Sequence, residues 1–353
     1  MKTIVFFGIY DPGYSRNRIL TQGFKENGWE VLVCRADARS GFFYKYVELY
    51  RQFKLIKAKK IDLVLVAFPG QTVVLMAKVL FRRKKIVFDM FLSLFDSNVY
   101  DRKVYGKYSP KAFKDWLLDW HSCALSDVIL LDTNEHISYV SSQFHISSKK
   151  MIRVPIGADT SVFRPLQTPA KNDMFTLHFH GMFIPLQGIE YILGAAKILI
   201  NEPMKFVIVG SGQEYKKAVQ IVVEQQLTNV ALLGKMPFEK LPEMIAASDM
   251  CLGIFGHTEK AARVVPNKVF EYIAMNKPVI TADTKAVREF FTDGVDMTMC
   301  ASADAASLAE AIRKVQKDAA SCARIAQKAY ERSCAEFAPA PIVKNLLKSP
   351  LLS

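Results

Sequence analysis

The chain has 353 residues, of which half are hydrophobic and 23% are charged, so it has the composition of a globular protein and the length of two domains. Its six cysteines are scattered without a CxxC pair or a His-rich segment, which argues against a disulfide framework or a metal site and for a reducing compartment. The formal net charge of +13 is uneven, because residues 1–165 hold 26 Lys/Arg and 15 Asp/Glu (net +11) and residues 166–353 hold 21 and 19 (net +2). The first half is therefore expected to meet an anionic partner.

The first apolar run, TIVFFGI (3–9), is short and soon followed by an aspartate and a glycine, which is typical of a strand and not of a signal peptide. The longest apolar stretch, residues 61–81, is interrupted by a Pro-Gly pair and carries Asp62 and Lys78. A strand, a turn and a helix explain it better than a membrane span. We therefore expect a cytoplasmic protein.

Apolar runs of strand length recur along the chain and are continuous, as in parallel strands that are covered on both faces. They are residues 3–9, 30–36, 62–68, 85–91 and 127–133, and then 175–181, 205–212, 230–236, 250–255 and 278–283. Helical segments such as 18–28 lie between them, so two βαβ series separated by the loop 154–173 predict an α/β protein of two doubly wound domains facing a cleft. The predicted boundaries are 1–165 for the N-terminal domain, 166–337 for the C-terminal domain with its helical end at 307–337, and 338–353 for a tail.

Two segments of the second half suit a phosphorylated ligand. VIVGSGQEY places Gly210 and Gly212 after a strand, where backbone can approach a ligand closely, although a tight turn alone would also need glycine. In VVPNKVFEYIAMNKPVI (264–280), a proline marks a helix start whose free N–H groups favour a phosphate. Lys268 adds a positive charge there and Glu271, one turn on, can accept from ribose hydroxyls. The alternative is a surface i, i+3 ion pair.

Six segments in order resemble glycosyltransferase family 4, whose members have the GT-B fold of two Rossmann-like domains. They are DTNEHISYV (132–140), VPIGADTSVFRP (154–165), FHGMFIPLQGIEYILGAAKIL (179–199), FVIVGSGQEY (206–215), LPEMIAASDMCLGIF (241–255) and the segment 264–280. The resemblance implies a retaining, metal-independent glycosyltransferase without a cofactor. It would move a sugar from a nucleotide-diphosphate donor to a lipid-linked or saccharide acceptor in bacterial-type surface polysaccharide synthesis. In the family, the glutamate that matches Glu271 binds the donor's ribose.

The sequence departs from the family pattern at three positions. Arg263 stands eight residues before Glu271, where the family commonly has a second glutamate, and Met182 and Gln187 replace an arginine and a lysine that face the diphosphate. One interpretation is that Arg263, as a catalytic cation, acts with Lys268 on a relocated phosphate site while Glu259 or His257 moves toward the sugar. The other is that catalysis is impaired or lost. The predicted donor-binding residues are Gly181, Gln187, Gly210, Gly212, Met236, Lys268 and Glu271.

The first domain is expected to hold the acceptor. Gly13, Arg16 and Arg18, in the loop after the first strand, are candidates to meet an acceptor or donor phosphate, although the arginines would equally suit a solvated helix start. Asp89, at the end of the fourth strand, is the candidate catalytic base, with a buried structural aspartate as the alternative.

The histidines do not suggest a metal site. His121 and His136 are expected to be packing or surface residues. His178 and His180 point to one face of a strand without a third ligand nearby, so no metal ion is expected.

Aromatic and basic residues are interleaved in the first domain at 46–60, 82–85 and 100–120. Such segments suit an anionic membrane surface, which predicts a peripheral protein at the inner face of the membrane. A solvated charged face is the alternative, and nucleic-acid binding is not expected because no known module is present.

Two other functions stay open at this point. A nucleotide-sugar 2-epimerase shares the two-domain fold and needs no separate acceptor. A non-catalytic, membrane-associated relative would explain the altered residues Met182, Gln187 and Arg263.

Overall fold

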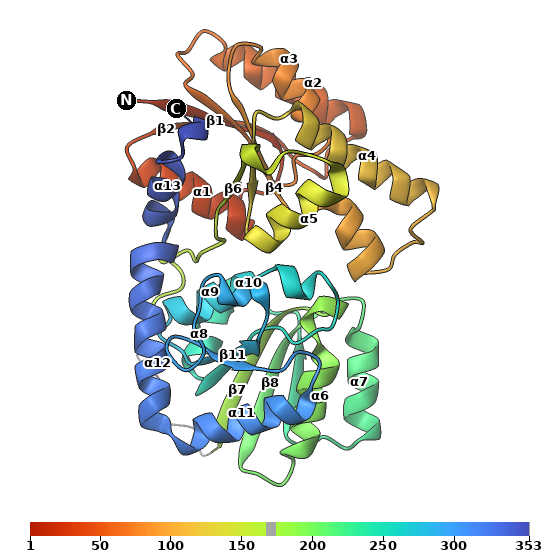
Figure 1. Ribbon diagram of the computed structural model, residues 1–353, viewed down its shortest axis with the longest axis vertical. Helices are drawn as coiled ribbons and strands as arrows, with labels where there is room; N and C mark the ends of the chain where they lie inside the picture. Colours follow the sequence, from red (N-terminus) through yellow and green to blue (C-terminus); the bar gives the residue numbers. More distant parts are fainter. Residues whose placement is uncertain (167–173, 353) are drawn as a thin grey trace. The chain divides into compact units, whose positions relative to one another are not determined.

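The computed structural model describes residues 1–166 and 174–352, which fall into two compact units (Figure 1). The first unit consists of residues 1–99 and 103–157 together with the C-terminal residues from 337 on. The second unit consists of residues 100–102 and 158–336. Part of the predicted loop 154–173, namely 167–173, lies outside the described residues, as does the last residue of the predicted tail.

The described residues of the first unit form a parallel sheet of six strands in the order β2-β1-β3-β4-β5-β6. These are β1 (Thr3–Ile9), β2 (Glu30–Ala36), β3 (Leu63–Val66), β4 (Ile86–Phe91), β5 (Val128–Leu131) and β6 (Met151–Arg153). The helices are α1 (Ser15–Glu26), α2 (Phe42–Ile56), α3 (Val74–Leu80), α4 (Pro110–Leu125), α5 (Asn134–Phe144) and α13 (Pro339–Leu347). The five strands expected here are confirmed, and β6 was missed.

Successive side chains of β1 enter opposite layers of the first unit, as the two-residue period of a strand requires. Phe6 joins the core cluster that contains Phe24 of α1 and Val343 of α13. Phe7, one residue on, meets Phe81 just after α3 edge-to-face, with ring centroids 5.7 Å apart. Both layers bury the strand, which is why its sequence is continuously apolar.

The C-terminal helix α13 is part of the first unit's core. Ile342, Val343 and Leu346 are buried in the cluster that holds the first strands. A Cβ atom at Gly23 of α1 would lie 2.3 Å from the carbonyl oxygen of Pro339, so α1 and α13 touch where only glycine fits. The predicted separate tail at 338–353 is therefore wrong: its described residues complete the first unit (Figure 1).

The described residues of the second unit form another parallel sheet of six strands, in the order β12-β11-β10-β7-β8-β9. These are β7 (Phe175–Met182), β8 (Met204–Ser211), β9 (Val230–Gly234), β10 (Met250–Leu252), β11 (Val279–Ala282) and β12 (Thr298–Cys300). The helices are α6 (Ile189–Ile198), α7 (Tyr215–Glu224), α8 (Leu241–Ala246), α9 (Asn267–Ala274), α10 (Lys285–Arg288), α11 (Ala305–Lys317) and α12 (Ala319–Arg332). The five expected strands are again confirmed, and β12 was missed.

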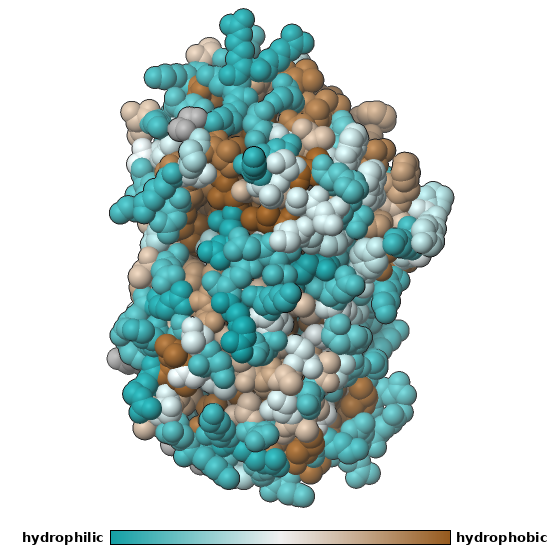
Figure 2. Space-filling model, in the orientation of Figure 1, coloured by the Kyte–Doolittle hydropathy of each residue, from teal (hydrophilic) through white to brown (hydrophobic). Residues whose placement is uncertain are grey.

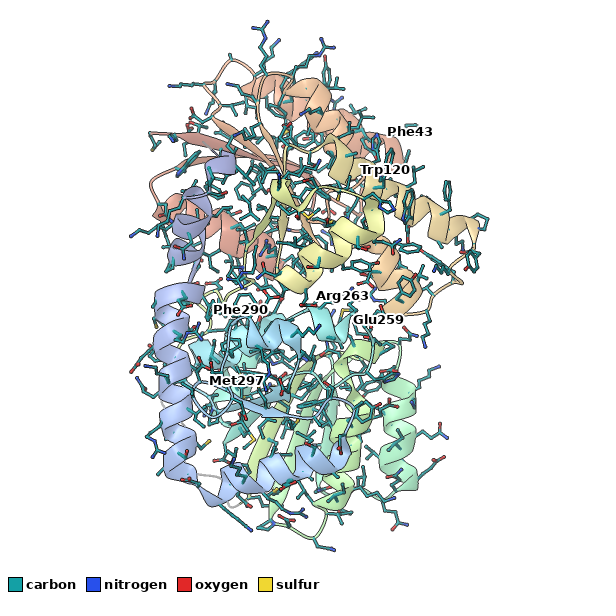
Figure 3. The ribbon with its side chains drawn as sticks, viewed as in Figure 1. Phe43, Trp120, Glu259, Arg263, Phe290 and Met297 are labelled. Atoms are coloured by element: carbon teal, nitrogen blue, oxygen red, sulfur yellow. The ribbon has the colours of Figure 1, made fainter. Side chains whose placement is uncertain are left out.

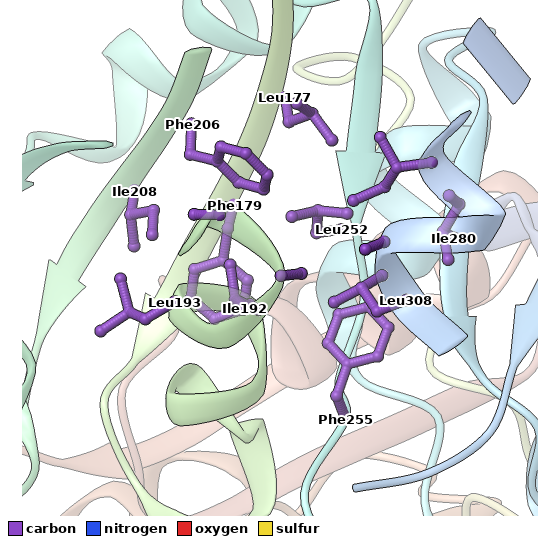
Figure 4. Close-up of a cluster of buried hydrophobic side chains, with 14 of the residues drawn as sticks. Leu177, Phe179, Ile192, Leu193, Phe206, Ile208, Leu252, Phe255, Ile280 and Leu308 are labelled. Atoms are coloured by element: carbon purple, nitrogen blue, oxygen red, sulfur yellow. The ribbon is translucent and has the colours of Figure 1, made fainter. Parts of the chain in front are cut away.

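One face of this second sheet is closed by a large apolar cluster (Figure 4). Leu177 and Phe179 of β7 and Phe206 of β8 meet Ile192 of α6 and Leu308 of α11. Because Leu177 and Phe179 point into this cluster, His178 and His180 of the same strand point to the opposite face.

Residues 100–102 belong to the second unit although the chain around them belongs to the first. The buried carboxylate of Asp101 accepts a hydrogen bond from the backbone N–H of Leu186, at 3.0 Å. The carbonyl of Arg102 accepts one from Gln213 Nε2, also at 3.0 Å. The units thus divide near residue 157, earlier than the predicted 165, and at 336, one residue from the predicted 337.

Within the described ranges, no helix combines the length and the apolar character that crossing a bilayer requires. In the same residues, no group of three His, Cys, Asp or Glu side chains is placed to hold a metal ion.

Candidate functional site

Helix α9 begins where the Pro-Asn pair predicts. Pro266 is its N-cap residue, in extended conformation, and Asn267 is the first helical residue. Lys268 and Glu271 then lie in the first turns, but neither is at the surface, since they are only 4% and 5% exposed. A surface ion pair, the alternative for these two residues, does not fit this burial.

Lys268 places a buried amine at the end of β7. Its Nζ donates to Oε1 of Gln187 and lies 3.6 Å from the centre of the Phe179 ring, which stabilises a cation through the ring's negative face. Burial holds the pKa of Lys268 well below its ordinary value, and the nearby Glu271 carboxylate opposes that shift only in part. An anion bound here would meet a positive group that is poorly compensated by the protein.

Glu271 faces the same strand. Its Oε2 lies 2.8 Å from Nε2 of His180, and Nδ1 of His180 lies 3.0 Å from Nε2 of His178. The backbone N–H of His180 donates to the hydroxyl of Tyr272, the next residue of α9, at 3.1 Å. These contacts tie the start of α9 to the end of β7.

The predicted glycines allow close backbone contact at the carboxyl ends of β7 and β8. Gly181 and Gly210 are register partners, and a Cβ atom on Gly210 would lie 1.8 Å from the carbonyl oxygen of Gly181. A Cβ atom on Gly181 would in turn lie 2.6 Å from Nζ of Lys268. Gly212 follows β8, and a Cβ atom there would lie 2.7 Å from the carbonyl oxygen of Phe183. Glycine at these positions lets the backbone of β8 and the amine of Lys268 approach the end of β7.

Gln187, Met182 and Met236, the other positions discussed for the donor, differ in burial. Gln187 is buried and is the hydrogen-bond partner of Lys268. Met182 is 52% exposed at the end of β7, and Met236 is half-buried beyond the end of β9. The structure thus brings Gly181, Gln187, Lys268 and Glu271 together, whereas Met236 takes part in none of the contacts described above.

Arg263 lies in the loop before α9 and pairs with Glu259, with Nη1 and Oε2 3.2 Å apart (Figure 3). The Glu259 side chain is 79% exposed, whereas that of Arg263 is 12% exposed. His257 in the same loop lies 3.1 Å from the hydroxyl of Tyr191. The role of Arg263 at the phosphate stays a prediction.

In the first unit, Asp89 and Arg16 are partners of each other. Arg16 Nη2 lies 2.9 Å from Asp89 Oδ1, both side chains are fully buried, and Nη1 of Arg16 donates to the carbonyls of Val154 and Pro155. Burial raises the pKa of Asp89, and the Arg16 guanidinium opposes this shift. This arrangement favours the buried structural alternative for Asp89. It does not fit the solvated helix start expected as the alternative for Arg16, because Arg16 is fully buried and spends its donors inside the unit.

Gly13, Arg18 and His136 are further residues of the first unit that were singled out from the sequence. Gly13 is exposed and its N–H donates to Asp11, while Arg18 is half-buried in the first turn of α1. His136 is buried, with Nδ1 2.7 Å from Asp132, which agrees with a packing histidine.

The chain shares its fold with solved structures over nearly its whole length. Anabaena Alr3699/HepE in complex with UDP-glucose matches with a TM-score of 0.72, 17% identity and 99% of both chains covered. Sucrose-phosphate synthase from Thermosynechococcus elongatus matches with a TM-score of 0.75, 15% identity, and 99% of this chain and 98% of that chain covered. Each unit is a parallel sheet with helices on both sides, so the fold is GT-B, as the resemblance implied.

The match to a family model lies in the second unit. Residues 175–318 match the family model described as "Glycosyl transferases group 1". An uncharacterized glycosyltransferase of Methanocaldococcus jannaschii, MJ1178, is 28% identical over 116 residues, which are 33% of this chain and 31% of that protein. The matched segments span only 26% to 31% of the length of the curated relatives. The resemblance to glycosyltransferases is confirmed, and the narrower assignment to family 4 stays a prediction.

His178, His180 and Tyr272 belong to this site but are not among the site residues that the sequence predicts. The signal was present, since two histidines two residues apart on a strand must share a face. Their partner, Glu271, lies 91 residues from His180 in the chain, and no spacing rule connects them.

Proposed function

We propose that this protein is a retaining glycosyltransferase that uses a nucleotide-diphosphate sugar, with the donor bound at the carboxyl edge of the second sheet. The observation that carries the proposal is the pair of buried charges at the start of α9, inside the segment that matches the glycosyltransferase model. Burying Lys268 and Glu271 is costly without a purpose, because each loses its hydration. A diphosphate and a ribose supply the anion and the hydroxyl groups that such side chains bind.

The chemistry follows from where charge develops. As the bond to the sugar breaks, negative charge grows on the departing diphosphate, so a fixed cation stabilises the transition state more than the bound donor. Lys268, which is buried, and the N–H groups at the start of α9 supply that charge. Glu271 uses Oε2 for His180, and a carboxylate has enough acceptor positions to take ribose hydroxyls as well. Arg263 remains a proposed second cation.

We propose that the acceptor binds to the first unit. A pocket of about 520 Å³ opens beyond the ends of β1 and β2 and is lined by Tyr10, Asp11, Arg35, Asp37 and Arg39 among others. Carboxylates, guanidinium groups and a tyrosine beside one another suit the hydroxyl groups of a saccharide, and the arginines also suit a phosphate on a lipid-linked one. Ligands of doubly wound sheets bind at this edge.

Replacing Glu271 with alanine is expected to weaken binding of the donor nucleotide at least tenfold. Each charge-assisted hydrogen bond to a ribose hydroxyl contributes about 1.5–3 kcal/mol. Titration calorimetry with UDP, GDP and ADP identifies the nucleotide on the wild type and then measures the variant. The exposed Glu310→Ala is the matched control. Equal affinity of wild type and folded Glu271→Ala would refute the assignment, and no binding of any of the three by the wild type would refute the donor site.

The epimerase and the non-catalytic alternative predict different products. An epimerase would convert a UDP-N-acetylhexosamine alone to its epimer, and a non-catalytic relative would transfer no sugar to any acceptor. Incubation with donor alone and with donor plus acceptor separates these functions from glycosyl transfer.

We also propose that the first unit docks on an anionic membrane surface at the inner face of the membrane. Helix α2 exposes Phe43, which is 80% exposed, and Leu55, and α3 exposes Leu75 and Val79. Figure 2 shows apolar side chains at the surface over α2 and α3, beside hydrophilic ones. Lipid contact would cover this apolar surface, and exposed lysines at the end of α2 suit anionic headgroups.

Helix α4 adds an aromatic stripe to the proposed membrane surface. The rings of Phe113, Trp116 and Trp120 are stacked in sequence, with centroids 6.4 and 6.2 Å apart. Phe113 is 64% and Trp120 37% exposed, and Figure 3 shows Phe43 and Trp120 at the outer margin of the unit. Aromatic rings of this kind gather at the interface between water and lipid.

Replacing Lys54, Lys57, Lys59 and Lys60 with glutamine is expected to reduce binding to vesicles that contain anionic lipid by at least tenfold at low salt. Each basic residue near such a surface contributes about 1 kcal/mol, and salt screens that attraction. Vesicle co-sedimentation at several salt concentrations measures the effect. The control replaces four exposed lysines of the second unit, Lys216, Lys235, Lys314 and Lys328, with glutamine. Equal loss in both variants would mean that only net charge matters, and no loss in either would remove the proposal.

A further inference from the structure

Three buried side chains of the second unit form an unbranched line of hydrogen bonds. Glu271 Oε2 is 2.8 Å from His180 Nε2, and His180 Nδ1 is 3.0 Å from His178 Nε2. Glu271 is 5%, His180 7% and His178 0% exposed. The two histidines come from β7 and the glutamate from α9, so the line crosses from the sheet to the helix that covers it.

The chemistry of the groups gives this line one direction. An ionised carboxylate only accepts hydrogen bonds, so Nε2 of His180 must carry the proton that it donates to Glu271. A neutral imidazole then has a bare Nδ1, which accepts from Nε2–H of His178. Burial and the neighbouring His180 and Lys268 lower the pKa of His178 well below its ordinary value, which keeps that ring neutral. With His180 neutral, both rings are Nε2–H tautomers.

The far end of the line is consistent with this direction. Nδ1 of His178 has no hydrogen-bond partner among the described residues, and the ring lines a pocket of about 430 Å³ beside α8. With the tautomers above, this nitrogen is an acceptor and carries no proton. A buried acceptor without a partner is tolerated more often than a buried N–H without one.

Other contacts hold the middle of the line in place. The backbone N–H of His180 donates to Tyr272 at 3.1 Å, and the two rings meet edge-to-face with centroids 5.1 Å apart. The His178 ring meets the same tyrosine at 5.9 Å. Tyr272 is fully buried, so His180 has little freedom to turn away from Glu271.

We propose that His178 and His180 are positioning residues that orient the carboxylate of Glu271 toward the donor's ribose through this directed line of hydrogen bonds. The proposal rests on the donor site proposed above. The Glu271 side chain has several rotamers available. When His180 holds Oε2 in place, the direction in which Oε1 points is also fixed. Supporting residues behind a binding group commonly set its orientation in this way.

The tautomers can be measured without any nucleotide. Long-range ¹H–¹⁵N correlation spectra of protein labelled with ¹⁵N-histidine distinguish Nε2–H from Nδ1–H rings, and His178→Leu, His180→Met and His121→Gln assign the signals. We expect both His178 and His180 to be Nε2–H tautomers. A neutral Nδ1–H ring at His180 would overturn the proposal, because it could not donate to Glu271 through Nε2.

The effect on binding separates orientation from packing. His180→Met puts an apolar side chain of similar length in the site and removes the N–H that donates to Glu271. It is expected to raise the Kd for UDP about tenfold. His180→Gln restores an N–H near the position of Nε2 and should recover most of that affinity, which a purely structural role of the ring would not predict. His121→Gln, on α4 of the first unit, is the control for loss of a histidine.

The outcomes of the proposal and of the donor site are distinguishable. If Glu271→Ala weakens UDP binding but His180→Met binds UDP as the wild type does, the positioning role is refuted and the donor site stands. If the wild type does not bind UDP, the donor site fails for this nucleotide, and the tautomer spectra still decide the direction of the hydrogen bonds. Equal weakening in His180→Met and His180→Gln would also overturn the proposal.

Discussion

Replacing Lys268 with methionine is expected to lower the rate of sugar transfer at least about 100-fold. Methionine keeps the apolar length of the side chain and removes the cation that faces the departing diphosphate, and each factor of ten corresponds to about 1.4 kcal/mol of transition-state stabilisation. The affinity for the donor should change less, because the charge grows as the bond breaks. Turnover and donor Kd measured on the same preparation test both statements.

The control for Lys268 is Lys285→Met, which removes an exposed lysine from α10 of the same unit. Full turnover in a folded Lys268→Met variant would contradict the role of this residue. If Arg263→Ala instead causes the larger loss, the diphosphate lies at the loop before α9, as the relocated phosphate site requires.

Donor binding is also expected to be accompanied by proton uptake at Lys268. Burial lowers the pKa of Lys268 in the free protein, and a bound diphosphate would raise it, since a nearby anion favours the charged amine. Binding therefore takes up a proton at any pH between the two values. Calorimetry in buffers of different ionisation enthalpy measures this uptake, which should be absent in Lys268→Met.

Replacing Arg16 with methionine is expected to destabilise the first unit by about 3–5 kcal/mol. Removing one partner of a buried ion pair leaves an uncompensated charge, here the carboxylate of Asp89. The carbonyls of Val154 and Pro155 also lose their donor. Chemical denaturation followed by fluorescence measures the loss, and Arg16→Met combined with Asp89→Leu should recover part of it because no buried charge remains.

An exposed pair of the same type is the matched control for Arg16. Arg39 and Asp37 lie 2.9 Å apart at the surface of the first unit, and such pairs contribute little to stability. Arg39→Met should unfold as the wild type does. If Arg16→Met did so too, the pair with Asp89 would not be structural, and the catalytic interpretation of Asp89 would regain support.

The sequence predicts local features of this fold well and distant pairings poorly. The ten expected strands lie in apolar runs that stand out, including the three-residue β10, which further apolar residues follow. The three residues of β6 (MIR) and of β12 (TMC) include polar side chains and form no such run. The proline before α9 marks the helix start correctly. Lys268 and Glu271 stand out because they are charged residues in a mostly apolar segment. The tertiary fold determines which residues these charged side chains contact.

The partners of the charged residues show this limit. Lys268 meets Gln187, 81 residues away, and Arg16 meets Asp89, 73 residues away. Arg16 looks like a phosphate ligand at a loop because nothing in the sequence says that it turns inward. Gln187 looks like a lost lysine because its hydrogen bond to Lys268 is visible only in three dimensions.

The place of α13 has a consequence for biosynthesis. The core of the first unit needs Ile342, Val343 and Leu346, which leave the ribosome only after all of the second unit, residues 158–336, has been made. At about 5–20 residues per second this interval lasts roughly 10 to 35 seconds. During that time the apolar side of α1, with Phe24 and the tight contact at Gly23, has no helix to cover it. The unit that is translated first is therefore the last to close its core.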